Sequence, residues 1–448
     1  MIFLSFLVLL CFTTCRLGHG IGLHGFHFHG LEEPRSLSKS ASENITELWI
    51  RQPVDHFNVR DNRTWLMRYY ENSRYFKKNG PILIMIGGEW AISKGFLEAG
   101  LMYELASTYN AIMYYTEHRY YGKSKPTEDT STKNLQYLSV DQALADLAYF
   151  IETRKKDEKL HNSKVIVFGG SYAGNVATWV RLKYPHLVQG ALASSAPVLA
   201  KVDFYEYYEV VSESLRRHSQ KCMDEVKAAF DDVQELLAVK GGAQKLKEYF
   251  KDWRFSCRTK INVWKIITTS LSKFTEMKHG TRNLISVRFL LMASKRRSCA
   301  CELFIINPRM SVFPVRLWFY QTCTEYGYYQ TTNSRKSVFG TLFPLPYFME
   351  IVHKLYRLSY SYGNGFLYTR IERTNTMYGG LRPDLQNVIF TNGDVDPWHV
   401  LSVLQDLNAF SPAILIKGSS HCRDLITYLV VALIIRYNKS IDDLILSI

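Results

Sequence analysis

A serine at a sharp corner of the chain is the first residue whose setting could support chemistry. It stands in VIVFGGSYAGNVATWVRLKYP, which covers residues 165–185. The apolar run before Ser171 predicts a buried strand, and the amphipathic stretch over 174–184 predicts a helix. The neighbours are small, as a tight and strained turn requires: Gly169, Gly170, Ala173 and Gly174. A serine between a strand and a helix is typical of a nucleophile elbow, although the usual pattern has glycine where this chain has Ala173.

A serine hydroxyl is a weak nucleophile, and it needs a general base that an acid orients. The C-terminal part of the chain offers both at the ends of two predicted strands. FTNGDVDPWH carries Asp394 and Asp396, and ILIKGSSHC carries His421. The order serine, acid, histidine is the one found with a nucleophile elbow. Spacing alone leaves open which aspartate is the acid, and His399 is a rival base that opens a predicted helix.

Two backbone N–H groups are candidates for an oxyanion hole. Tyr172 follows the serine at the N-terminus of the predicted helix, where the N–H groups favour negative charge. The GGE turn at 87–89 follows an earlier predicted strand and offers Gly88 as the second donor. Glu89 of the same turn is a candidate substrate-binding residue.

Alternating strands and helices must position these residues. PILIMIGGE (81–89) is an apolar run typical of a strand that is buried on both faces, LEAGLMYELASTY predicts a helix, and AIMYYTEHRYYG predicts the next strand. Ser139 and Gln142 predict a capping box at the start of another helix. This alternation predicts a mostly parallel sheet with helices on both faces, preceded by antiparallel strands over 46–68.

The alternation stops after Pro197 and resumes near Asn387. Residues with helical spacing predict a helical block between these points, longer than any ordinary loop. We expect a signal peptide at 1–20, a flexible segment at 21–45, the first part of the core at 46–200, a helical cap at 201–330 and the second part of the core at 331–448.

The composition excludes several classes of function. The chain has 448 residues, of which 47% are hydrophobic and 21% are charged, as in an ordinary globular protein. Its formal net charge of +14 comes from scattered lysines and arginines, so we predict no nucleic-acid partner. Cys299 and Cys301 have no second pair at the spacing of a zinc site, so neither a metal nor a cofactor is predicted. LITYLVVALII (425–435) is too short to cross a bilayer.

The first residues predict a secretory route. Ile2–Phe12 is a short apolar stretch, and Gly18 and Gly20 follow it, as in a cleaved leader. A leader implies an oxidising compartment and an extracellular, lysosomal or other vesicular destination. The candidate glycosylation sites are Asn44, Asn62 and Asn438. The disulfide candidates are Cys222, Cys257, Cys299, Cys301 and Cys323, with their connectivity open.

Several motifs resemble the serine carboxypeptidase family of lysosomal Pro-X carboxypeptidase, the quiescent-cell dipeptidyl peptidase and thymus-specific serine protease. They are GGSYAG, RLKYPHLV, ASSAPV, EHRYYGKS, WFYQTCTEYGYYQTT and NGDVDPWHVLSV. GGSYAG and DPWHVLSV are most similar to the thymus-specific branch. The resemblance covers most of 45–275 and 316–424, whereas 276–315 and the tail after 425 depart from the family pattern.

The resemblance implies an α/β-hydrolase core with an inserted helical cap. It also implies that Ser171 is the nucleophile, Asp396 the acid and His421 the base, and it therefore selects Asp396 over Asp394. A disulfide between Cys257 and Cys323 is implied in the same way.

The implied activity is proteolysis by a serine exopeptidase, of carboxypeptidase or dipeptidyl-peptidase type, next to proline. Trp398 is then a candidate wall of the slot for a proline ring. The expected partners are proline-containing peptides, and a homodimer stays open. Two alternatives remain: an esterase or lipase with the same triad, and an inactive secreted binding protein on the same scaffold.

Overall fold

The computed structural model describes residues 22–23, 26–27, 31–34, 44–242, 245, 313–356 and 363–426. The predictions for the leader, Asn438, Cys257, Cys299, Cys301, segment 276–315 and all but the start of the tail after 425 lie outside these residues.

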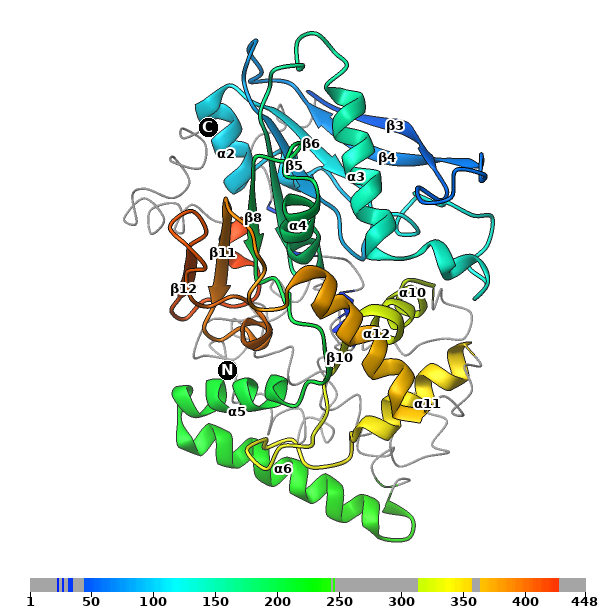
Figure 1. Ribbon diagram of the computed structural model, residues 1–448. Helices are drawn as coiled ribbons and strands as arrows, with labels where there is room; N and C mark the ends of the chain where they lie inside the picture. Colours follow the sequence, from blue (N-terminus) through cyan, green and yellow to red (C-terminus); the bar gives the residue numbers. More distant parts are fainter. Residues whose placement is uncertain are drawn as a thin grey trace, which may run out of the picture.

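An eight-stranded sheet forms the centre of the described chain, with the strand order β12-β11-β8-β7-β5-β6-β4-β3 (Figure 1). The strands are β3 (Ile45–Pro53), β4 (Thr64–Asn72), β5 (Ile82–Ile86), β6 (Ile112–Thr116), β7 (Val165–Gly170), β8 (Gly190–Ser194), β11 (Val388–Gly393) and β12 (Ala413–Ile416). The strands from β12 to β6 pair in parallel, and β4 and β3 add an antiparallel edge. The predicted mostly parallel sheet is confirmed.

Helices cover both faces of this sheet. The helix α4 (Tyr172–Lys183) packs on β7 and β8 beside α3 (Val140–Arg154). Successive residues of a strand face opposite sides. A β-carbon at Gly169 would meet the carbonyl of Ala173 in α4, whereas one at Gly170 would meet Leu425. The opposite face therefore carries the short helix η8 (Arg423–Leu425), which packs with α2 (Leu101–Tyr109).

A helical block separates β8 from β11 and lies beyond the carboxyl ends of the parallel strands, in the lower half of Figure 1. Its described helices are α5 (Glu206–His218), α6 (Gln220–Ala238), α10 (Phe313–Gln321), the π-helix η5 (Thr322–Tyr326), α11 (Leu345–Tyr356) and α12 (Gly363–Tyr378). The short strands β9 (Lys201–Asp203) and β10 (Gly327–Tyr329) pair in parallel within it. The block runs past the boundary expected at 330, because the chain returns to the sheet only at Val388.

The predicted capping box at the start of α3 is only half formed. The hydroxyl of Ser139 accepts a hydrogen bond from the N–H of Gln142 over 3.4 Å. The Gln142 side chain does not return to Ser139, because its Oε1 accepts from the N–H of His56 and its Nε2 donates to Asp55. The N–H of Val140 donates to Glu325 of η5 over 2.8 Å. Tertiary partners thus replace the local one and tie this helix to the helical block.

Candidate active site

Ser171 occupies a strained corner between β7 and α4. Its φ of 58° and ψ of −131° lie outside the regions that a residue with a side chain favours. The N–H of Ser171 donates to the carbonyl of Ser194 over 2.9 Å, and the N–H of Gly174 donates to the carbonyl of Ser171 over 2.9 Å. The Ser171 side chain does not cap α4. The fold therefore holds the backbone of this serine while its hydroxyl is kept out of the helix cap.

Small residues are required at this corner, as the sequence predicts. A β-carbon on Gly169 would lie 2.0 Å from the carbonyl oxygen of Ala173, and one on Gly174 would lie 2.8 Å from the β-carbon of Ala196. Ala173 itself is completely buried. Alanine therefore fits where the usual pattern has glycine, and larger residues would push the turn apart.

The acid and the base meet at the edge of the sheet where β7 also ends. The carboxyl ends of parallel strands share one edge, so the segments after β7, β11 and β12 lie on the same side of the molecule. Nδ1 of His421 lies 2.9 Å from Oδ2 of Asp396. Oδ1 of Asp396 accepts the backbone N–H of Trp398 over 3.0 Å. The Asp396 side chain is fully buried and that of His421 is 5% exposed.

The two rival residues have other partners. The Asp394 carboxylate accepts the N–H of Gly418 over 2.5 Å and forms an ion pair with Arg217 over 2.9 Å. Nδ1 of His399 lies 2.6 Å from the backbone carbonyl oxygen of Asp396. The partner of His399 is thus the Asp396 backbone, whereas the partner of His421 is the Asp396 carboxylate. The geometry thus pairs Asp396 with His421.

The carboxylate of Asp396 shifts the pKa of the His421 imidazole. Burial alone would lower the pKa of His421, but the opposite charge of Asp396 outweighs it and raises the pKa of the imidazole well above its ordinary value. A buried carboxylate at Nδ1 is the arrangement that holds an imidazole in one tautomer and stabilises its protonated form.

The end of β8 contacts both Ser171 and the segment after β12 that carries His421, which we call the histidine segment. The Ser194 carbonyl, which accepts the N–H of Ser171, also accepts the thiol of Cys422 over 3.6 Å. The N–H of Cys422 donates to the hydroxyl of Ser195 over 3.0 Å. The buried carboxyl of Asp424 accepts the hydroxyls of Ser194 and, over 2.6 Å, of Thr391. The sequence analysis gave Cys422 and Asp424 no role in the site, and their only signal was their place one and three residues after His421.

The predicted oxyanion donors lie at the ends of two neighbouring strands. Tyr172 opens α4 directly after Ser171, and its backbone N–H belongs to the first turn, where no carbonyl of the same helix can accept it. Gly88 follows β5, which pairs with β7 in parallel. Glu89 is completely buried in the same turn. The roles of all three residues stay predictions.

A buried polar cluster fixes the side chain of Tyr172. Its hydroxyl lies 3.0 Å from Nε2 of His118, accepts from Nε2 of Gln321 over 3.0 Å, and lies 3.3 Å from the hydroxyl of Tyr326. Burial lowers the pKa of His118 to about 4, so this imidazole is neutral at physiological pH. Gln321 and Tyr326 belong to the helical block and His118 to the segment after β6. The motifs EHRYYGKS and WFYQTCTEYGYYQTT carried the signal for this cluster.

Trp398 lies in an aromatic cluster between the core and the helical block. Its ring centroid is 5.4 Å from that of Tyr328, 5.2 Å from that of Phe204 and 6.4 Å from that of His421. The residue is 3% exposed. A role as the wall of a proline slot remains a prediction.

Two of the predicted disulfide candidates, Cys222 and Cys323, fall on described residues. Cys222 and Cys323 are free thiols in the structure. Cys323 lies within η5, and its Sγ donates to the carbonyl of Tyr320 over 3.1 Å. The implied bridge between Cys257 and Cys323 stays a prediction, because Cys257 lies outside the described residues.

Other features bear on the expected partners and location. Asn44 and Asn62 have exposed side chains, as glycan attachment would require. In the described part of the chain, no group of three or more histidine, cysteine, aspartate or glutamate side chains could hold a metal ion. The helices of that same part include none that combines the length and the apolar character needed to cross a membrane.

Comparisons with known proteins identify similar chains. The family model of serine carboxypeptidase S28 matches residues 52–284 and 305–429, which include Ser171, Asp396 and His421. The stretch between the two matched parts is shorter than the segment 276–315 that was expected to depart from the family.

Two relatives illustrate the range of similarity. The thymus-specific serine protease of Mus musculus is 34% identical over 423 residues, which cover 84% of this chain and 82% of the relative. The lysosomal Pro-X carboxypeptidase of Homo sapiens is 28% identical over 435 residues, which cover 88% of this chain and 86% of the relative. Among solved structures, the proline iminopeptidase of Mycobacterium smegmatis has a TM-score of 0.39 and 10% identity over 87% of this chain and 97% of that chain.

Proposed function

Because the chain belongs to the serine carboxypeptidase S28 family, we propose that it is a serine exopeptidase that cleaves short peptides next to proline. The observation that carries this proposal is the buried Asp396–His421 pair at the edge of the sheet where Ser171 stands at a strained corner. This is the arrangement that an acyl-transfer site needs: a nucleophile at an elbow, a base and an orienting acid.

In the proposed reaction, Oγ of Ser171 attacks the carbonyl carbon of the scissile peptide bond. Nε2 of His421 takes the hydroxyl proton, and Asp396 stabilises the imidazolium that forms. The backbone N–H groups of Tyr172 and Gly88 donate to the oxygen that becomes negatively charged. His421 then gives the proton to the leaving amine, and an acyl-enzyme ester remains on Ser171. Water, activated by the same imidazole, hydrolyses this ester and restores the free serine.

Restriction to short peptides would come from the helical block. It lies beyond the carboxyl edge of the sheet, and Gln321 and Tyr326 of the block contact Tyr172 directly next to the nucleophile. A cap of this kind limits which chains reach the serine. Trp398 is the candidate for the proline ring, and Glu89 is the candidate for a polar end of the peptide. The name of the Pro-X carboxypeptidase relative supports a preference for proline.

Peptides with matched sequences test the proposed activity. Purified protein is incubated with short peptides that differ only by proline or alanine before the scissile bond, and the products are identified by mass spectrometry. We expect cleavage of the proline peptide in preference to the alanine peptide. Amidation of the C-terminus should block a carboxypeptidase, and acetylation of the N-terminus should block a dipeptidyl peptidase. Hydrolysis of acyl esters without cleavage of any peptide would overturn the proposal in favour of an esterase or lipase.

We also propose that the protein enters the secretory pathway and reaches the lysosome or the cell exterior. The leader predicted at 1–20 and the exposed sequons at Asn44 and Asn62 support this route, as does the lysosomal relative. Removal of N-linked glycans by an amidase should lower the mass of the protein from animal cells and convert Asn44 and Asn62 to aspartate. An unchanged mass would count against the proposed route.

A further inference from the structure

The four residues Leu31–Pro34 pack against the core, although they belong to the segment 21–45 that was expected to be flexible. Leu31 is 7% exposed, and burial raises the pKa of Glu33 even though hydrogen bonds from its neighbours oppose the shift. The core residues that these four contact are 60 or more positions away along the chain. We call these four residues the brace.

The brace reaches the corner that carries the nucleophile. A β-carbon on Gly170, directly before Ser171, would lie 2.6 Å from Cδ1 of Leu31. The same position would be 2.8 Å from Cδ1 of Leu425 and 3.0 Å from Sγ of Cys422. Leu31 therefore fills the space under the elbow together with two residues that closely follow His421.

The brace also contacts the histidine segment from outside. Glu32 forms an ion pair with Arg423 over 2.6 Å, two residues after the proposed base. Both side chains of this pair are partly exposed, so the pair contributes little by itself. A β-carbon on Gly100 would lie 2.9 Å from Cγ of Pro34 and 2.7 Å from the carbonyl oxygen of Leu425. Pro34 thus packs where α2 and the end of the histidine segment meet.

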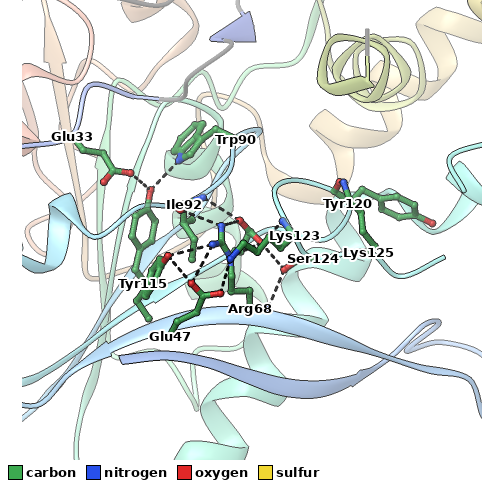
Figure 2. Close-up of polar contacts among 12 residues, drawn as sticks. Glu33, Glu47, Arg68, Trp90, Ile92, Tyr115, Tyr120, Lys123, Ser124 and Lys125 are labelled. Carbon is green, nitrogen blue, oxygen red and sulfur yellow. Dashed lines mark hydrogen bonds and ion pairs between the residues drawn. The ribbon is translucent and has the colours of Figure 1, made fainter. Parts of the chain in front are cut away.

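A third set of contacts links Glu33 of the brace to the turn at 87–89, which carries Gly88, the second predicted oxyanion donor. Oε1 of Glu33 accepts the hydroxyl of Tyr115 over 3.1 Å, and Nε1 of Trp90 donates to the same hydroxyl over 2.9 Å (Figure 2). The ring of Trp90 covers Gly88, because a β-carbon there would lie 2.4 Å from Cζ3 of this ring. Oε2 of Glu33 accepts the N–H of Gly95 over 2.9 Å and the hydroxyl of Ser93. The Glu33 carboxyl is thus the polar anchor of the brace.

We propose that the brace sets the relative geometry of the three segments that form the active site, with Leu31 and Glu33 as positioning residues. This inference rests on the proposed function. Catalytic groups act only when they are held close to the productive geometry, and segments that follow strands are among the less rigid parts of a fold. The brace packs against the elbow, contacts the segment after β12 that carries His421, and reaches the turn at 87–89 through Tyr115 and Trp90. It therefore acts on Ser171, His421 and Gly88 without touching the substrate.

Substitutions in the full chain test the brace. Glu33→Ala removes the anchor, and Leu31→Ala removes the packing under Gly170. Glu33→Gln keeps the acceptor oxygen and the shape, and Glu32→Gln changes only the exposed ion pair. For each variant the rate of labelling by a fluorophosphonate probe, kcat and KM for a short peptide, and the melting temperature are measured.

We expect Glu33→Ala and Leu31→Ala to lower both the labelling rate and kcat roughly tenfold or more, with KM nearly unchanged, because misplacing catalytic groups slows the chemical step. Glu33→Gln should recover most of the rate, and Glu32→Gln should resemble the wild type. Labelling of Glu33→Ala and Leu31→Ala at the wild-type rate would overturn the inference. Losses that match the fall in melting temperature and appear equally in Glu33→Gln would also overturn it. If the wild-type protein itself is not labelled, the proposed function fails instead.

Discussion

Asp394 and Asp396 stand two residues apart after β11, and their carboxylates serve different partners. Asp396 accepts Nδ1 of His421 in a buried pair, whereas Asp394 accepts the N–H of Gly418 and pairs with Arg217 of α5. One carboxylate therefore orients a candidate base, and the other fastens the turn after β12 and a helix of the block. Two aspartates that are close in sequence therefore have different structural roles.

Substitution of these two aspartates by asparagine separates their roles. Asp396→Asn should lower kcat by roughly three to four orders of magnitude, because an amide no longer stabilises the imidazolium or holds the right tautomer. Asp394→Asn should lower kcat by less than about tenfold, with a modest loss of stability. Turnover of a peptide or ester substrate by the two purified variants checks this. Equal losses, or a larger loss for Asp394→Asn, would contradict the assignment of the acid.

The buried carboxyl of Glu325 makes stability depend on pH. Burial raises the pKa of Glu325 from 4.5 to about 8, so the folded chain holds a proton that the unfolded chain releases between these values. Its contribution to the free energy of unfolding is therefore fully present below pH 4.5 and is lost as the pH rises toward 8. Glu325→Gln stays neutral at every pH, and its amide oxygen can still accept the N–H of Val140.

We expect the melting temperature of Glu325→Gln, relative to wild type, to be higher at pH 8.5 than at pH 4.5. The exposed Glu350 of α11 offers a matched control, because Glu350→Gln leaves the buried contacts of Glu325 unchanged. Thermal unfolding at the two pH values measures both variants. A relative melting temperature of Glu325→Gln that is flat, or that falls toward pH 8.5, would show that this carboxyl is not held protonated.

Trp398 should affect the selection of proline more than the reactivity of the serine. Trp398→Phe is the useful variant, because alanine would leave a cavity that costs about 3–5 kcal/mol in a buried cluster. We expect the ratio of kcat/KM for the matched proline and alanine peptides to fall several-fold, while fluorophosphonate labelling of Ser171 stays within about twofold, since the catalytic groups are unchanged. An unchanged ratio of kcat/KM together with slower labelling of Ser171 would contradict this prediction. Trp398 would then support the position of His421 and would not bind the substrate.

Local sequence patterns were enough to predict the parallel sheet, the serine corner and the order of the three catalytic candidates. Buried apolar runs and small residues report directly on strands and tight turns, and these are local properties. The choice between Asp394 and Asp396 needed more, because it depends on Arg217, which lies 177 residues away along the chain. Only a resemblance to known proteins could make that choice from the sequence.

Long-range contacts also explain what the sequence analysis missed. The side chain of Gln142 leaves its capping box for His56 and Asp55, which no local pattern announces. The segment 21–45 is rich in histidine and polar residues and suggests flexibility, yet Glu33 finds its donors in Ser93, Gly95 and Tyr115. A buried carboxyl of this kind becomes recognisable only when its tertiary partners are known.

Covalent labelling of Ser171 tests the central claim most directly. The full chain and Ser171→Ala are treated with a fluorophosphonate probe, and the labelled residue is identified by peptide mapping with mass spectrometry. Thermal unfolding first establishes that Ser171→Ala is folded. We predict one adduct on Ser171 in the wild type, none in Ser171→Ala, and loss of peptide hydrolysis by several orders of magnitude in the variant. An adduct that persists in Ser171→Ala, or that maps to another residue of the wild type, would contradict the account.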